Sequence, residues 1–211
     1  MDLNYRSAAM TYTLAQPLTF KTFIVEYGDQ FCYELADGEL IDRSPTGTHE
    51  AVAGKTASKL SVEIDRQNLP FIIPKTCILR PQSSEATARR PDVIVLDERS
   101  LVQEPHWQRE PIILYGESIK LVVEVVSTNW ENDYARKVEE YELMNISEYW
   151  IVDFRALGGI RYIGDPKQPT LTVNRLAGRL YEQVQYRLGD RIESPLFPEL
   201  NLQLDDLIPK Y

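Results

Sequence analysis

The sequence has few of the residues that cross-link a chain or bind metals through nitrogen, because its 211 residues include only two cysteines and two histidines. Cys32 and Cys77 form no Cys-x-x-Cys pair, and Cys77 lies in an apolar run, which is typical of buried free thiols in a reducing compartment. A disulfide has no support in this pattern. His49 and His106 are too few to build a multi-histidine metal site, so that class of metal centre is excluded.

Long apolar segments and targeting signals are also absent. No stretch approaches the ~18–20 apolar residues that cross a bilayer, and the N-terminus lacks the charged-then-apolar order of a secretory signal. We therefore expect a cytoplasmic protein with no membrane partner. Because 211 residues fit one domain of ordinary size, we expect a flexible leader over residues 1–17 and a single domain over residues 18–211.

Basic residues are fewer than acidic ones. The chain carries 23 Lys and Arg against 32 Asp and Glu, for a net charge of -9. This sign argues against broad, non-specific adhesion to nucleic acid, although it leaves room for a local basic groove. The hydrophobic content of 43% is enough for a folded core and excludes a disordered polymer.

The hydrophobic pattern that is present predicts an α/β protein. Apolar residues that recur every three to four positions predict helices over residues 20–27, 48–68 and 131–145. Apolar β-type runs predict strands over residues 31–35, 39–42, 71–74, 77–79, 92–96, 120–126 and 149–154. Three further runs, over residues 160–163, 170–175 and 180–186, predict a C-terminal antiparallel meander. The strand–helix–strand order from 120 to 154 predicts a parallel or mixed sheet with a right-handed crossover.

Two of the predicted strands carry an acidic residue where a hydrophobic one is expected. Asp92 opens one apolar run, and Glu124 interrupts the most apolar run of the chain. A carboxylate in a buried strand costs several kcal/mol unless a cation, a proton or hydrogen bonds compensate it. Two such carboxylates on neighbouring strands repel by about 4 kcal/mol at ~4 Å and an effective dielectric near 20. A divalent metal between them is one solution, so the first hypothesis is a metal-dependent active site.

The helix that follows the second acidic strand adds a possible third group. Asp133, Lys137 and Tyr141 are spaced i, i+4 and i+8, so they share one helix face. Because this helix begins at the carboxyl end of the Glu124 strand, Lys137 can reach back toward the acidic pair. A lysine there can position a nucleophile or neutralise a developing oxyanion. Carboxylate and carbonyl oxygens suit Mg²⁺ or Mn²⁺.

Short motifs follow one another in a recognisable order along the chain. They are Gly38-Glu39, Ser44-Pro45 with His49, Pro91-Asp92, Val123-Glu124-Val125-Val126-Ser127, Asp133-x-x-x-Lys137 and Glu148-Tyr149-Trp150-Ile151-Val152-Asp153. This ordered set resembles the Uma family of endonucleases, long catalogued as a domain of unknown function, within the PD-(D/E)XK restriction-endonuclease-like superfamily. The resemblance covers about residues 18 to 208.

The resemblance implies a restriction-endonuclease-like core, in which a central mixed β-sheet is flanked by helices, and a Mg²⁺- or Mn²⁺-dependent site that hydrolyses DNA. By motif position, Asp92 and Glu124 match the catalytic and metal-binding acids, and the carbonyl of Val125 is a third ligand. The superfamily pattern places a lysine two residues after the acid. Val126 stands there instead, and Lys137 on the following helix takes the lysine's role.

Each of these residues also has a plain structural interpretation. The expected neighbours of the site are Glu39, His49, Ser127 and Asp133. In the structural interpretation, Glu39 is a polar hairpin residue and His49 a structural histidine. Ser127 is then a helix N-cap and Asp133 a first-turn acid that suits the helix dipole. Lys137 fits a solvated helix position, and Tyr141 fits core packing. Arg89 and Arg90 either meet phosphates or form an ordinary charged loop.

An alternative function stays open beside the nuclease. The net charge of -9 and Val126 at the motif lysine position favour a catalytically inactive interaction module that retains the nuclease fold. The sequence contains no Gly-x-Ser-x-Gly motif, which argues against a metal-independent hydrolase. The residues alone do not separate DNA from RNA. A homodimer is also expected, because the meander has an edge that pairing could cover.

Overall fold

The computed structural model describes residues 17–82 and 84–210. The leader predicted over residues 1–17 lies outside them, except for Pro17. The helices are α1 (Phe20–Tyr27), α2 (Gly47–Gln67), η1 (Leu101–Gln103), η2 (Gly116–Ser118), η3 (Asn132–Arg136), α3 (Lys137–Leu143), α4 (Ile160–Ile163) and α5 (Leu204–Leu207). The strands are β1 (Tyr33–Ala36), β2 (Glu39–Asp42), β3 (Phe71–Ile72), β4 (Ile78–Leu79), β5 (Val93–Asp97), β6 (Ile112–Ile113), β7 (Ile119–Val125), β8 (Glu148–Asp153), β9 (Thr170–Ala177) and β10 (Leu180–Tyr186).

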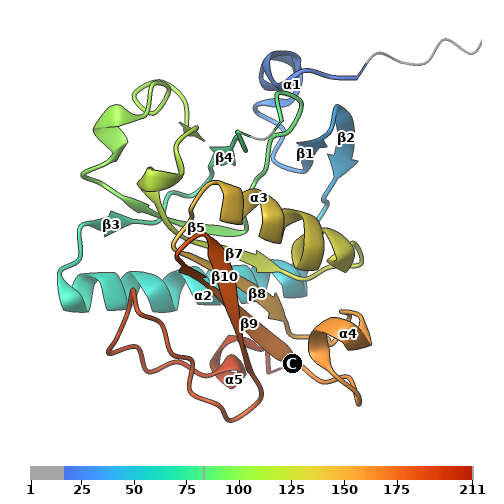
Figure 1. The fold of residues 1–211 in the computed structure, drawn as a ribbon, viewed down its shortest axis with the longest axis vertical. Coiled ribbons are helices and arrows are strands. Elements are labelled where there is room, and N and C mark those ends of the chain that lie inside the picture. Colours follow the sequence, from blue (N-terminus) through green and yellow to red (C-terminus); the bar gives the residue numbers. More distant parts are fainter. Residues whose placement is uncertain (1–16, 83, 211) are drawn as a thin grey trace, which may run out of the picture.

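A six-stranded sheet in the order β10-β9-β8-β7-β5-β3 forms the centre of the molecule. The β7–β8 pair is parallel and the other neighbours are antiparallel, so the sheet is mixed as predicted. Helix α2 lies across one face of the sheet and α3 across the other (Figure 1). The parallel pair is joined through α3, which is the strand–helix–strand unit that the sequence pattern indicates.

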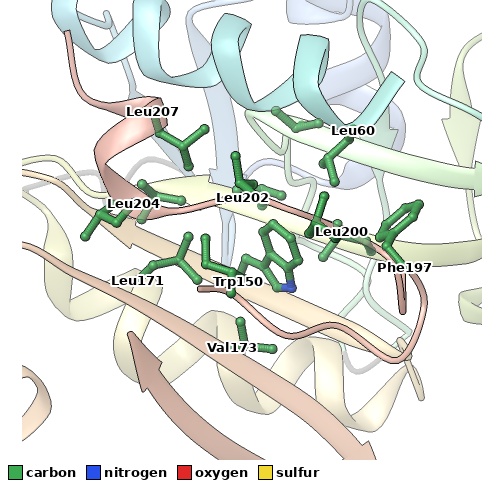
Figure 2. Packing of buried hydrophobic residues seen from close by; sticks show 14 of the residues in the cluster. Leu60, Trp150, Leu171, Val173, Phe197, Leu200, Leu202, Leu204 and Leu207 are labelled. Atoms are coloured by element: carbon green, nitrogen blue, oxygen red, sulfur yellow. The ribbon is translucent and has the colours of Figure 1, made fainter. Parts of the chain in front are cut away.

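The face under α2 is closed by the C-terminal segment. Val52, Leu60 and Ile64 give α2 an apolar stripe at helical spacing, and the helix begins where the Thr46 hydroxyl accepts from the His49 amide. Figure 2 shows the fully buried Trp150 of β8 among Leu60 of α2 and the leucines of the C-terminal segment, Leu200, Leu202, Leu204 and Leu207. This packing fixes α2, and with it His49, against the sheet.

The opposite face packs on the helix that follows β7. Ile94, Val122 and Ile151 of three neighbouring strands share one buried cluster with Tyr141 of α3. The Tyr141 ring meets that of Tyr149 edge to face, with centroids 4.9 Å apart. The helix enters through the π-helical turn η3 rather than through a capped first turn. Among the described residues no side chain caps this end, so the cap predicted at Ser127 is not made.

A β-hairpin and α1 form a small layer beside the sheet. The strands predicted over residues 31–35 and 39–42 pair as the hairpin β1–β2, with Asp37 and Gly38 at φ values of 49° and 84°, as a two-residue hairpin turn requires. Phe20, Phe23 and Leu35 pack against Ile78, Ala88 and Ile112. The hairpin is thereby held next to the segment that leads into β5, where Leu35 bridges to Ala88, and this brings β1 and β2 to the edge of the site described below.

The predicted strand over residues 160–163 is wrong, because this segment is the short helix α4. Its alternation of Ile160, Arg161, Tyr162 and Ile163 also fits a single helical turn. In that turn Ile163 is fully buried and Tyr162 stacks on Tyr134, with centroids 5.1 Å apart. The antiparallel meander is still present, but it consists of β8, β9 and β10. Within the described ranges, no helix has both the length and the apolar character needed to cross a membrane.

Candidate active site

The register between β5 and β7 brings the two acidic residues together. Val93 pairs with Val123 and Ile94 with Val122, so the next position places Asp92 opposite Glu124. Opposite residues of antiparallel strands point to the same face, with Cβ atoms about 4.5–5.5 Å apart. Both side chains are removed from solvent, with 9% of Asp92 and 1% of Glu124 exposed. Two carboxylates therefore share one largely buried space at the end of β7.

The backbone of Val125 completes this end of the strand. The pairing of β5 stops at Val93, so the Val125 amide meets the Asp92 side chain and donates to its Oδ2 at 2.7 Å. The Val125 carbonyl points to the same side and lies 2.9 Å from His49 Nε2. Three oxygen-bearing groups, from Asp92, Glu124 and Val125, thus gather at one strand terminus.

Helix α3 and the turn before it supply the basic partner on the other side of Glu124. Lys137 Nζ lies 2.9 Å from Glu124 Oε2 and 3.0 Å from Asp133 Oδ1. Tyr141, one further turn along, donates its hydroxyl to Glu124 Oε1 at 2.9 Å. The shared face that the i, i+4, i+8 spacing predicts is present. Lys137 is buried rather than solvated, and Tyr141 both packs in the core and orients Glu124.

Arg43, which follows β2, lies between the two acidic strands. Its Nη2 is 2.8 Å from Asp92 Oδ1 and 3.4 Å from Glu124 Oε2. Its Nη1 is 3.0 Å from Glu34 Oε1 and also donates to the carbonyl of Arg90. One guanidinium therefore connects three carboxylates that come from β1, β7 and the start of β5.

Sequence reasoning missed Glu34 and Arg43. The signal for Glu34 was available, because this residue stands in the apolar strand β1 in the same way that Glu124 stands in β7. Arg89 and Arg90 were candidates for phosphate contacts, but both are buried. Arg89 makes two hydrogen bonds to Glu140, at 2.7 and 2.8 Å, and Arg90 donates to backbone carbonyls.

The charges set the protonation of the central groups. Burial acts to raise the pKa of Asp92, but the Arg43 charge and the His49 hydrogen bond outweigh it and hold the pKa below its usual value. Burial raises the pKa of Glu124 although Lys137 and Arg43 oppose the change. Burial acts to lower the pKa of Lys137, yet Asp133 and Glu124 raise it, so Lys137 stays an ammonium ion.

His49 is held at the start of α2 with its ring against the acidic pair. Its Nε2 lies 2.9 Å from the Val125 carbonyl and 3.3 Å from Asp92 Oδ2. Because a carbonyl can only accept, Nε2 carries a proton. Burial acts to lower the pKa of His49, but its hydrogen bond to Asp92 and the Asp92 charge raise it. Its Nδ1 is buried without a hydrogen-bond partner among the described residues.

A cavity of about 290 Å³ is lined by Arg43, Val125 and Lys137, whereas Asp92 lines a second cavity beside Arg43 and Glu124 lines neither of the two. Ser127 is exposed and lines the first cavity, as do Asp133 and Lys137, whereas Glu39 is exposed on β2 and contributes to neither of the two cavities that border Arg43. The polar and charged residues that line the first cavity are Glu34, Asp42, Arg43, Ser44, Thr46, His49, Arg89, Ser127, Thr128, Asn129, Asn132, Asp133, Lys137 and Arg155.

The donor set at the end of β7 fits a small divalent cation. In the part of the chain that the structure describes, no three His, Cys, Asp or Glu side chains are grouped as metal ligands. Mg²⁺, however, is commonly held by one or two carboxylates and completed by water, and Asp92, Glu124 and the Val125 carbonyl are such hard oxygen donors. Four carboxylates, those of Glu34, Asp92, Glu124 and Asp133, are paired with the cations Arg43, Arg89 and Lys137.

Comparisons with known proteins agree with this architecture. The sequence model of the Uma2 family, described as "Putative restriction endonuclease", matches residues 23–205. A solved structure of a putative nuclease belonging to DUF820 from Anabaena variabilis shares 17% sequence identity, with a TM-score of 0.66 over 90% of this chain and 97% of that one. At this identity the likeness concerns the fold. Among curated proteins, none matches the sequence.

Proposed function

This chain belongs to the Uma2 family of putative restriction endonucleases, and we propose that it is a nuclease that hydrolyses DNA phosphodiester bonds with the help of Mg²⁺ or Mn²⁺. The observation that carries the proposal is that Asp92 and Glu124 both contact one nitrogen of Arg43, beside the Val125 backbone and the Lys137 ammonium. Buried carboxylates held at such a cost to stability are typical of functional sites.

The proposed roles follow from the contacts. Asp92, Glu124 and the Val125 carbonyl would hold the ion, which when bound supplies charge neutralisation at a phosphoryl oxygen and a lowered pKa for an attacking water. Lys137 places a fixed positive charge beside Glu124, where it orients the water or stabilises charge that develops on the phosphate. Tyr141 fixes the rotamer of Glu124, and Asp133 fixes that of Lys137.

The mouth of the cavity offers groups that suit a phosphate backbone. Thr128, Asn129, Asn132 and Arg155 line it, and the exposed Arg155 is a charged donor. Side chains of these types account for many protein contacts to phosphate oxygens. These donors are compatible with a nucleic-acid substrate despite the net charge of -9, because a phosphate backbone needs local donors rather than a basic surface overall.

The test is Mn²⁺-dependent nicking of supercoiled plasmid at low salt. We expect Asp92→Asn and Glu124→Gln, which keep the side-chain shapes, to reduce nicking by about 100-fold or more. Asp97→Asn is the matched control, because Asp97 lies at the other end of β5 and pairs with Lys120 at 3.2 Å. It should nick as the wild type does.

Two results would contradict the proposal. Nicking that survives both site substitutions would place the activity elsewhere or in a contaminant. No nicking by the wild type, together with no Mn²⁺-dependent rise in melting temperature, would favour the inactive module, since an ion that binds only the folded state must stabilise it.

The domain and assembly predictions also enter as proposals. We propose that residues 18–211 fold as one domain, which the ion pairs between the hairpin segment and the sheet support. A homodimer is supported by the position of β10, which ends the sheet with an unpaired strand edge within the described residues. Sedimentation equilibrium would give about twice the 24.3 kDa of the chain for the dimer.

A further inference from the structure

A single nitrogen atom of Arg43 contacts both proposed metal-binding carboxylates. Nη2 lies 2.8 Å from Asp92 Oδ1 and 3.4 Å from Glu124 Oε2, so it bridges the two side chains as a cation. Arg43 does not come from either acidic strand. It follows β2, and its side chain reaches across from the hairpin layer.

We propose that Arg43 is a built-in competitor for the divalent cation: its Nη2 bridges Asp92 and Glu124 in the metal-free protein and withdraws when the ion binds. This inference rests on the proposed function, because it concerns regulation of the same site. Two cations cannot both sit between one pair of carboxylates, since they repel each other and need the same oxygen lone pairs.

The two arms of the guanidinium have separate partners, which makes a local withdrawal possible. Nη1 contacts Glu34 Oε1 at 3.0 Å and the Arg90 carbonyl, and neither group is a proposed metal ligand. Nη2 can therefore leave Asp92 and Glu124 while Glu34 still balances the charge of Arg43. Glu34 is 2% exposed and receives the Arg90 amide at 2.7 Å, so it is a fixed anchor.

There is also space to receive the displaced side chain. Arg43 lines the cavity that holds Lys137 and also a second cavity of about 340 Å³, whose lining includes Phe31 and Glu50 as well as Asp92 itself. The Arg43 side chain is 19% exposed, more than any of the three carboxylates that it contacts. Arg43 is the member of the cluster that can move without leaving a buried charge uncompensated.

Direct measurement of Mn²⁺ binding tests the proposal. Titration calorimetry at one fixed pH compares wild type, Arg43→Gln and Arg43→Lys. We expect Arg43→Gln to lower the dissociation constant for Mn²⁺ by about tenfold or more, the scale of one charge-assisted contact that the ion no longer has to displace. Arg43→Lys should fall between the two, because a single ammonium cannot bridge the carboxylates and hold Glu34 at once. Arg43→Lys also keeps the positive charge, so it still tests the proposal if Arg43→Gln fails to fold.

Melting temperature supplies a second readout. Without metal, Arg43→Gln should melt below the wild type, because its carboxylates repel without a bridging cation, and saturating Mn²⁺ should remove most of that difference. The matched control is Arg66→Gln, since Arg66 also joins two carboxylates, Glu63 and Glu199, but lies far along α2. Its Mn²⁺ affinity should equal that of the wild type.

The outcomes separate this inference from the proposed function. If the wild type binds Mn²⁺ and Arg43→Gln binds it equally or more weakly, Arg43 is not a competitor, while the metal site itself stands. If neither protein binds Mn²⁺, and nicking is also absent, both the inference and the metal-dependent nuclease are wrong.

Discussion

At the residue scale, the hydroxyl of Tyr141 makes a contact that core packing alone does not require. It donates to Glu124 Oε1 at 2.9 Å inside a fully buried environment. Tyr141→Phe keeps the ring and removes only this donor, so a buried carboxylate oxygen loses its partner. We expect a loss of about 1–3 kcal/mol in unfolding free energy and a fall in Mn²⁺-dependent nicking, measured by urea denaturation and the plasmid assay.

Tyr181→Phe is the control for that substitution. Tyr181 donates to the Ile146 carbonyl at 2.8 Å, away from the acidic pair. Its loss should lower stability without changing nicking by the folded protein. Equal nicking by both variants would show that Tyr141 does not orient Glu124 for the reaction.

The residues of the site differ in how visible they are in the sequence. Glu124 and Asp92 stand out because each interrupts an apolar run, and the Asp133–Lys137–Tyr141 face follows from helical periodicity. Arg43 gives no such signal, since an arginine after a hairpin is ordinary on any surface. Its place between the acids depends on the hairpin packing beside Asp92 and Glu124, which lie 49 and 81 residues further along the chain than Arg43.

At the scale of elements, the β1–β2 turn requires a backbone conformation with positive φ that favours glycine. Substitution of Gly38, compared with Gly54 of α2, tests this requirement. Gly38 has φ +84°, and a Cβ there would collide with Pro17, so Gly38→Ala should cost about 1–3 kcal/mol. Gly54 is an exposed residue of α2 with open space for a Cβ, so Gly54→Ala should stabilise the protein by about 0.4–1 kcal/mol. Chemical denaturation measures both, and equal effects would refute the hairpin argument.

The same scale shows where the predicted elements failed. Helices α1 and α2 and strands β1 and β2 lie close to their predicted bounds, because the spacing of their apolar residues marks them clearly. The strand predicted over residues 160–163 was wrong, because a run of only four residues fits the periodicity of a strand as well as that of a helix. The π-helical turn η3 has no sequence signal of its own, because its hydrogen bonds depend on how α3 docks on the sheet.

At the scale of the whole molecule, Glu148 ties the C-terminal segment to the central sheet. It accepts from Trp150 Nε1 and Ser194 Oγ, at 2.8 and 2.9 Å, and burial raises its pKa above the ordinary value of 4.5. The folded state therefore holds the Glu148 proton more tightly than the unfolded chain does. Its contribution to stability is full below pH 4.5 and is lost as pH rises through the folded pKa.

Comparison with Glu148→Gln isolates this effect. Because the amide does not ionise, the unfolding free energy of the variant relative to wild type should increase from pH 4.5 upward and level off above the folded pKa. Denaturant midpoints measured at several pH values give this difference. A difference that stays constant with pH would show that Glu148 ionises as readily in the folded protein as in the unfolded chain.

The fold class could be predicted from the sequence, whereas the spatial arrangement of the elements could not. The mixed sheet follows from two strand runs with a helix between them, and the meander from successive apolar runs near the C-terminus. The order of strands in space and the C-terminal cover over Trp150 do not follow from local patterns. They depend on contacts between segments far apart in the chain, for which a single sequence holds no periodic signal.

The long reach of Arg43 has a consequence for how the molecule forms. Its contacts with Asp92 and Glu124 close loops of 49 and 81 residues, and closing such loops costs chain entropy that local contacts do not. A chain emerging from the ribosome cannot assemble the acidic cluster until β7 and then α3 have been synthesised and docked. Chains that end before α3 therefore lack Lys137 and Tyr141, and with them the complete cluster.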